Sequence, residues 1–89
     1  MKDRYLEVTF RKGKPIAAYL YLPRDPGEKS QRTEKAGNGI LIDYGKAGRP
    51  IGIEITAPDH VSLSVLNDVL ATLNVRSLEA SELAPLLAA

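Results

Sequence analysis

The chain of 89 residues is long enough for one small domain with a single core. It is 44% hydrophobic and 26% charged, as is typical of a globular protein. The absence of cysteine excludes disulfide bonds and thiolate chemistry, and it suits a cytoplasmic location. No apolar run approaches the roughly 20 residues that cross a bilayer, and the first residues lack a signal-peptide core. We therefore expect no membrane association.

The charge is unevenly distributed, although the net charge is only +1. Residues 1–46 carry 10 Lys/Arg and 6 Asp/Glu, whereas residues 47–89 carry 2 and 5. A basic first half could attract a polyanion. Because the excess is small and dispersed, we favour solvated turns followed by an acidic helical tail.

The first third of the chain predicts a β-hairpin. Apolar and polar residues alternate over residues 5–10, residues 11–15 supply a turn, and a second strand spans residues 16–22. The predicted pairs on the apolar face are Leu6 with Leu20, Val8 with Ala18 and Phe10 with Ile16. The pairs on the other face are Tyr5 with Tyr21, Glu7 with Tyr19 and Thr9 with Ala17.

A polar stretch separates this hairpin from the next one. Residues 23–31 contain the turn sequence Asp25-Pro26-Gly27, and we expect a mobile loop there. Residues 32–36 predict a short strand whose charges suit a sheet edge, since lysine discourages pairing with another chain. The glycines at 37 and 39 then allow a tight turn.

The segment Gly39–Thr56 predicts a second hairpin around Gly45-Lys46-Ala47-Gly48. We pair Tyr44 with Arg49, Ile42 with Ile51 and Ile40 with Ile53. Burial of one face sets the register, because a slip of one residue would move the isoleucines to the opposite side. The buried side then carries the isoleucines, Ile55 and Tyr44, and the opposite side carries Leu41, Asp43, Gly52 and Glu54.

After Thr56 the apolar period becomes helical. The first helical stripe consists of Leu63, Leu66, Val69, Leu70 and Leu73. Ser62 or Ser64 can cap its start, and Asn74 is a plausible end. A second helical piece, which Ser77 could cap, would carry Leu83, Leu86 and Leu87. Because Pro85 removes a helical donor, this piece is expected either to be short or to begin late.

These elements predict an α+β fold in a single domain over residues 1–89. A four- or five-stranded antiparallel meander over residues 5–56 would be covered on its isoleucine face by one or two C-terminal helices within residues 62–88. The helix at residues 63–73 is the best cover for that face. Its presence on the opposite, tyrosine-bearing face would contradict this architecture.

Two stretches carry a family resemblance. The first is Ala18-Tyr19-Leu20-Tyr21-Leu22, and the second runs from Ile42-Asp43-Tyr44 through Gly48-Arg49 to Gly52-Ile53-Glu54-Ile55. Over roughly residues 5–73 the chain resembles the short bacterial and archaeal domain-of-unknown-function family 2283. Two acidic positions of the family pattern are Ile16 and Gly45 here. The resemblance implies a small sheet-plus-helix fold and no known activity.

The residues suited to chemistry do not form a catalytic set. His60, the only histidine, is interpreted as a connector residue. Asp43 and Glu54 share a face, but the predicted register puts them near opposite ends of the hairpin. The glycine-rich segments join strand to strand, whereas a phosphate loop opens a helix. We therefore expect no catalytic, cofactor or metal site and no enzymatic activity.

The sheet face away from the helix is the strongest candidate for binding. It carries three tyrosines, and tyrosine is common at protein interfaces. We expect it to contact a small protein partner or, most simply, a second copy in a homodimer, unless the loop 23–31 or the C-terminal piece covers it. The candidate interface residues are Tyr5, Ala17, Tyr19, Tyr21 and Leu41.

The alternative function is single-stranded nucleic-acid binding. The aromatic rings could stack bases while nearby cations contact phosphates. The candidate phosphate contacts are Arg11, Lys12, Lys14 and Arg24. Glu7 lies among the tyrosines, and no RNA-binding sheet signature is present, so we rank this alternative second.

Overall fold

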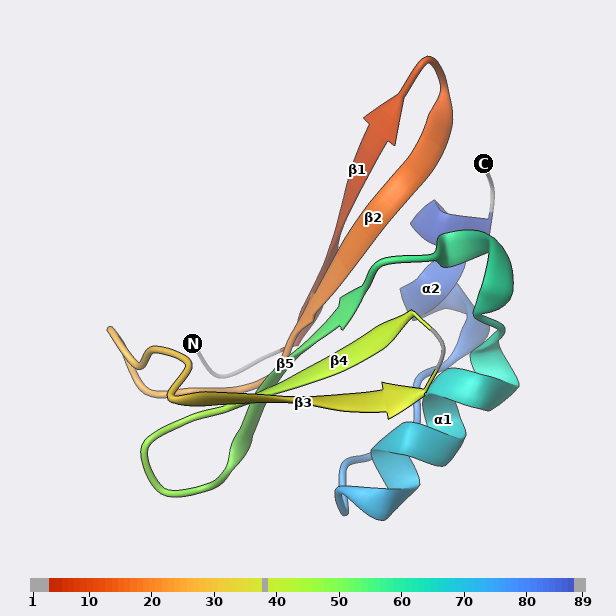
Figure 1. Ribbon diagram of the computed structural model, residues 1–89. Helices are drawn as coiled ribbons and strands as arrows, with labels where there is room; N and C mark the ends of the chain where they lie inside the picture. The colour runs from red at the N-terminus through yellow and green to blue at the C-terminus, as the bar shows by residue number, and fades with distance from the viewer. Residues whose placement is uncertain (1–3, 38, 88–89) are drawn as a thin grey trace.

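The computed structural model describes residues 4–37 and 39–87 (Figure 1). Within those ranges, no helix combines the length and the apolar character needed to cross a membrane. The elements are β1 (Tyr5–Arg11), β2 (Lys14–Tyr21), β3 (Arg32–Gly37), β4 (Ile40–Tyr44), β5 (Pro50–Ile55), the short 3-10 helix η1 (Pro58–His60), α1 (Leu63–Thr72) and α2 (Ala80–Leu87).

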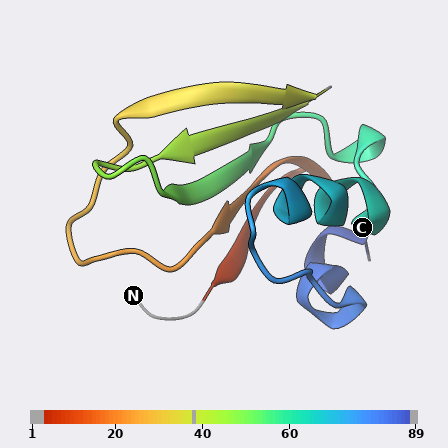
Figure 2. The ribbon, with the colours of Figure 1, turned by 90° about the horizontal axis from the view of Figure 1, so that it is seen from below.

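The five strands form one antiparallel sheet in the order β1-β2-β5-β4-β3. Both helices cover one face of it (Figures 1 and 2). The predicted α+β class is therefore confirmed. The strand order departs from a plain meander, because the chain crosses from β2 to the far edge and returns through β4 to pair β5 with β2. This order places the isoleucine-rich β5 at the centre and the charged β3 at an edge, as burial of apolar surface favours.

The β1–β2 hairpin follows the predicted register over most of its length. Leu6 pairs with Leu20 and Val8 with Ala18, and all three predicted pairs on the opposite face are also present. The pairing of Phe10 with Ile16 is wrong, because Phe10 lies opposite Pro15. The hairpin closes through a two-residue turn, with φ of 53° at Lys12 and 78° at Gly13. This tight turn leaves one extra residue on β2 as a bulge.

The β4–β5 register also differs from the predicted one. Ile40 pairs with Ile55 and Ile42 with Ile53, so the predicted partners are wrong by two residues. The predicted faces of these four isoleucines are nevertheless correct, because a shift of two residues preserves the side on which a side chain lies. The shift is absorbed by a bulge: Asp43 pairs with Gly52 but Tyr44 pairs with Pro50, which leaves Ile51 without an opposite residue. Ile51 is buried outside the main core cluster.

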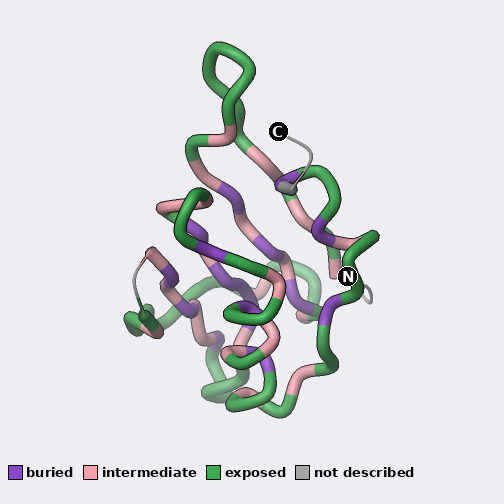
Figure 3. Tube along the Cα trace, turned by 90° about the vertical axis from the view of Figure 1, so that its right-hand side faces the viewer, coloured by how far each residue is buried: buried purple, intermediate pink, exposed green. Residues whose placement is uncertain are grey.

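The core lies between the isoleucine face of the sheet and α1. Leu66 and Leu70 of α1 are fully buried in the same cluster as the isoleucines of β4 and β5 (Figure 3). The Ser62 hydroxyl accepts a hydrogen bond from the Val65 N–H at 3.1 Å, which confirms this residue as the N-cap. At the other end Asn74 takes a φ of 57°. The Val75 N–H then bonds to the Leu70 carbonyl at 2.9 Å, as in a Schellman motif.

The second helix begins later than Ser77, and the predicted Ser77 cap is wrong. Its first residue is Ala80, and the Glu82 carboxylate accepts a hydrogen bond from the Glu79 N–H at 3.0 Å, which is half of a capping box. Leu83 and Leu86 are buried as predicted. The side chain of Leu87 and residue 88 of the predicted helical segment lie outside the described residues.

Arg4 ties the start of β1 to the C-terminal helices. Its guanidinium donates two hydrogen bonds to the Glu82 carboxylate, at 3.0 and 3.1 Å, and further ones to the carbonyls of Arg76 and Ser77. The Arg4 side chain is only 6% exposed. A nearly buried guanidinium needs this full set of acceptors, so the contact orders both ends of the domain.

Replacing Leu70 with alanine is expected to lower the free energy of unfolding by about 2–5 kcal/mol, because the cavity would lie at the centre of the core. Val65→Ala is the matched control, since Val65 lies on the same helix and is 42% exposed. Its effect should stay within about 0.5 kcal/mol. Urea denaturation measures both values, and equal effects would contradict the placement of α1.

Replacing Glu82 with glutamine should destabilise the protein by about 1–3 kcal/mol at neutral pH. The hydrogen bond from Arg4 and that from the Glu79 N–H hold the pKa of Glu82 below its ordinary value of 4.5. The unfolded chain therefore takes up the proton at higher pH than the folded chain does. The stabilisation is complete above about pH 4.5 and is lost as the pH falls through the lower folded-state pKa.

Urea denaturation of wild type and Glu82→Gln at pH 7 and pH 3 tests this, and the difference between them should shrink at pH 3. The control is Glu34→Gln, because Glu34 forms an ion pair with Arg32 at an exposed sheet edge. A difference between wild type and Glu82→Gln that is the same at both pH values would contradict the role of the Glu82 charge.

Candidate interaction surface

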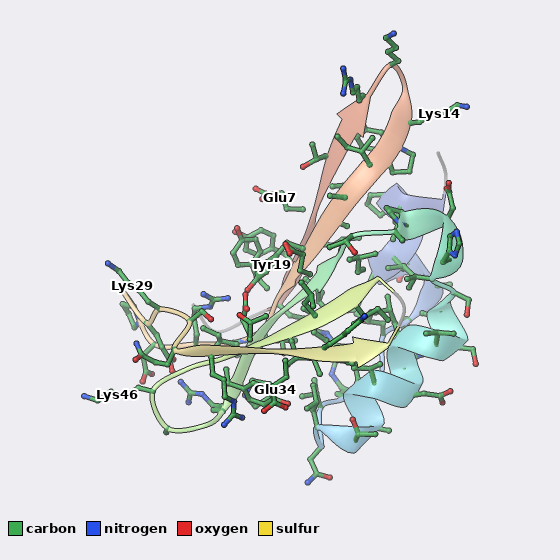
Figure 4. The ribbon with its side chains drawn as sticks, viewed as in Figure 1. Glu7, Lys14, Tyr19, Lys29, Glu34 and Lys46 are labelled. Carbon is green, nitrogen blue, oxygen red and sulfur yellow. The ribbon has the colours of Figure 1, made fainter. Side chains whose placement is uncertain are left out.

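The sheet face opposite the helices presents two rows of side chains that cross all five strands. The register aligns the first row as Tyr5, Tyr21, Gly52, Asp43 and Thr33. It aligns the second row as Glu7, Tyr19, Glu54, Leu41 and Lys35. We call these ten residues, with the neighbouring pair Thr9 and Ala17, the tyrosine face. The labelled side chains of Glu7 and Tyr19 project from it, away from the helices (Figure 4).

All five predicted interface residues belong to the tyrosine face. The three tyrosines form one aromatic cluster on β1 and β2. The rings of Tyr5 and Tyr21 stack with centroids 4.6 Å apart, and Tyr19 meets Tyr21 edge-on at 4.7 Å. Tyr5 remains 50% exposed. Stacking on β1 and β2 restricts the rotamers of these side chains, so the cluster is ordered without a partner.

Tyr19 is held in place by a hydrogen-bond network that the sequence did not predict. Its hydroxyl donates to Asp43 Oδ2 at 2.7 Å, and the Thr33 hydroxyl donates to Asp43 Oδ1 at 2.5 Å. The Tyr19 ring lies across Gly52, where a Cβ atom would overlap both ring and hydroxyl. A glycine among β-branched residues often marks such a close approach, and this signal could have predicted the contact.

The same environment fixes the protonation of Tyr19. Burial and the hydrogen bond to Asp43 raise the pKa of Tyr19 to about 12, although Arg24 partly opposes them. Burial, with a smaller contribution from Glu7, also raises the pKa of Tyr21. Both phenols therefore stay neutral at physiological pH and offer hydrogen bonds rather than charge.

The tyrosine face is acidic. It carries three carboxylates, from Glu7, Asp43 and Glu54, and one lysine, Lys35. The predicted wide separation of Asp43 from Glu54 is wrong, because the two-residue register shift pairs Asp43 with Gly52 and Glu54 with Leu41. They are diagonal neighbours, which places their Cα atoms about 7–8 Å apart. Within residues 4–37 and 39–87, no three acidic or histidine side chains are grouped to hold a metal ion.

The loop at residues 23–31 packs mainly against the β4–β5 loop rather than over the tyrosine cluster. Glu28 accepts hydrogen bonds from Arg49 at 2.5 Å and from the Asp25 N–H at 3.1 Å, and its side chain is only 10% exposed. The loop reaches the tyrosine face through Arg24, whose guanidinium lies 5.4 Å from the centre of the Tyr21 ring. This cation–π contact shows that the cluster accepts a guanidinium.

The four residues predicted to contact nucleic acid do not form one patch. Arg11 and Lys12 lie at the tip of the β1–β2 hairpin, whereas Arg24 lies beside Tyr21, beyond the other end of β2. Lys14 lies opposite Arg11 near the same tip and borders a shallow pocket with Asp59 and Leu86. His60 is exposed in η1, in the connector between sheet and helix.

Residues 17–57 match the family described as Protein of unknown function (DUF2283). The family resemblance is therefore confirmed for this segment, which is shorter than the predicted span of roughly residues 5–73. The matched segment runs from β2 to just beyond β5, and it includes Tyr19, Tyr21, Asp43 and Gly52. Two of the three clustered tyrosines and the whole Tyr19–Asp43 contact thus lie in the DUF2283 segment, while β1 and both helices lie outside it. No curated protein and no solved structure matches the chain.

Replacing Gly52 with alanine is expected to destabilise the protein by about 1–3 kcal/mol, because the methyl group would push the Tyr19 ring off its hydrogen bond to Asp43. In a Tyr19→Ala background the methyl group has room, so the same substitution should cost little. Urea denaturation of the two single variants and the double variant measures this coupling. Additive effects would contradict the contact.

Proposed function

We propose that this protein is a binding module without catalytic activity, and that its tyrosine face associates with a second copy of the chain. The observation that carries the proposal is the stacked pair of Tyr5 and Tyr21. The pair is ordered on the sheet, and Tyr5 is nevertheless half exposed. Ordered aromatic rings with restricted rotamers lose little conformational entropy on binding. Tyrosine is accordingly enriched at protein interfaces.

The chemistry of the face supports binding more than catalysis. Tyr19 and Thr33 both donate to Asp43, so this carboxylate is engaged within the sheet. A phenol with a pKa of about 12 is a poor general acid or base at neutral pH. Within the described part of the chain, Glu7 accepts only one long hydrogen bond, from the Tyr21 hydroxyl at 3.5 Å. Together with Glu54 and the exposed Tyr5 ring, it is suited to contact with cationic and aromatic side chains.

Charge argues for a protein partner rather than for nucleic acid. The tyrosines lie among three carboxylates, from Glu7, Asp43 and Glu54, which would repel a phosphate backbone and which outnumber the one guanidinium against Tyr21, that of Arg24. The hairpin-tip cations lie about 20 Å along the strand from Tyr5, at the usual rise of about 3.3 Å per residue. Single-stranded nucleic-acid binding therefore remains the second candidate, and the cytoplasmic location remains a prediction.

Sedimentation equilibrium of wild type and Tyr5→Ser tests the proposal. We expect wild type to be a dimer, and the substitution should weaken dimerisation roughly tenfold or more, as for a buried interface aromatic. Phe10→Ser is the matched control, because Phe10 lies on the same strand, is 49% exposed against 50% for Tyr5, and belongs to the apolar face.

Circular dichroism of the two variants confirms that each is folded before the comparison is made. The proposal is contradicted if wild type sediments as a monomer at high concentration. It is also contradicted if Phe10→Ser weakens association as much as Tyr5→Ser does.

A further inference from the structure

The β1–β2 hairpin projects beyond the rest of the sheet and carries opposite charges at its two ends (Figure 1). Arg11, Lys12 and Lys14 are exposed at the free tip, next to the two-residue turn. Glu7 and the stacked tyrosines lie toward the other end, in the same row as Glu54 of β5, with Tyr19 between the two carboxylates. The hairpin is therefore basic at its tip, whereas its base carries a carboxylate and the stacked tyrosines, with Arg24 against one side of Tyr21.

This arrangement is complementary to itself when one copy is reversed. By strand alternation Tyr5, Glu7, Thr9 and Arg11 share one side of β1. Glu7 and Arg11 lie two residues on either side of Thr9. Suppose that two hairpins face each other and are related by a two-fold axis. If the axis lies midway between them, runs perpendicular to the strands and passes over Thr9, then Arg11 of each copy lies over the partner's Glu7.

We propose that the hairpins of two copies pack face to face in opposite directions about such an axis. This inference rests on the proposed function, and it specifies the partner, the orientation and the part of the tyrosine face that is used. Arg11 pairs with the partner's Glu7 twice in each dimer. Lys12 lies over the partner's stacked Tyr5 and Tyr21, in the manner that Arg24 already adopts toward Tyr21 within one chain.

The residues around the axis fit close packing. Thr9 and Ala17 form a cross-strand pair of small side chains on the tyrosine face, at the level where the two hairpins would meet. Small side chains there let the sheets approach to about 10 Å, and the strands would cross at about 30° as in other aligned sheet packings. The basic tip of each copy would then cover the tyrosines and Glu7 of the partner. Cationic side chains are complementary to such a surface of aromatic rings and carboxylates.

Charge reversal provides a sharp test because the contact is reciprocal. Arg11→Glu places acid over acid in both halves of the dimer, and Glu7→Lys places base over base. Each variant alone should dimerise at least roughly tenfold more weakly than wild type. An equimolar mixture should recover dimerisation as a one-to-one heterodimer, because each charge that was reversed in one copy then opposes its complement in the other.

Lys46→Glu is the matched control. It makes the same change of charge as Arg11→Glu, but Lys46 is exposed in the loop between β4 and β5, away from the hairpin tip (Figure 4). Its dimerisation should stay within about threefold of wild type, as for a charge outside an interface. Sedimentation equilibrium of the three variants and the mixture, at low and high salt, gives all these values.

The outcomes separate this inference from the proposed function. Recovery of the heterodimer in the mixture, with Lys46→Glu unaffected, supports the antiparallel arrangement. If Tyr5→Ser weakens the dimer but both charge reversals leave it intact, the tyrosine face is still the interface and the antiparallel arrangement is overturned. A wild-type monomer overturns the proposed function itself, and a mixture that stays monomeric overturns the inference alone.

Discussion

The burial of isoleucines from β4 and β5 beneath α1 is the constraint on which the rest of the structure depends. Ile40, Ile42, Ile53 and Ile55 are almost fully buried, and Leu66 and Leu70 of α1 are buried in the same cluster. Because a strand alternates its side chains, covering this face commits the alternate residues to the opposite one. Tyr19, Asp43 and Glu54 are therefore directed away from the helices by the same packing that forms the core.

Three bulges adapt the sheet to its turns. Each of the β1–β2, β3–β4 and β4–β5 pairings shifts by one residue near its turn, which leaves Ile16, Ala36 and Ile51 as the extra residues. Bulges increase the local twist of a strand pair. The β1–β2 hairpin accordingly rises steeply away from the direction of β3 and β4 (Figure 1), so its tip stands clear of the compact part of the domain. This geometry leaves the hairpin tip accessible for contact with another molecule.

Polar contacts position the surface that the core leaves open. Arg4 connects the start of β1 to α2, and thereby holds the strand that carries Tyr5 and Glu7. On the tyrosine face, Asp43 receives hydrogen bonds from Tyr19 and Thr33, which come from strands on either side of the β4–β5 pair. Gly52 provides the space that lets the Tyr19 ring lie across β5. The aromatic cluster is thus preorganised, which lowers the entropic cost of binding.

The sequence by itself determined the α+β class, the faces of the strands and the limits of α1, because alternation, helical periodicity and the Ser62 cap are local signals. It also placed the charged β3 at an edge. Only the tertiary structure decided the strand order and the β4–β5 partners, since registers that differ by two residues bury the same isoleucines. The Tyr19–Asp43 contact was likewise decided only by the tertiary structure. It joins residues 24 positions apart across β5, and it exists only because the sheet places β2 beside β5.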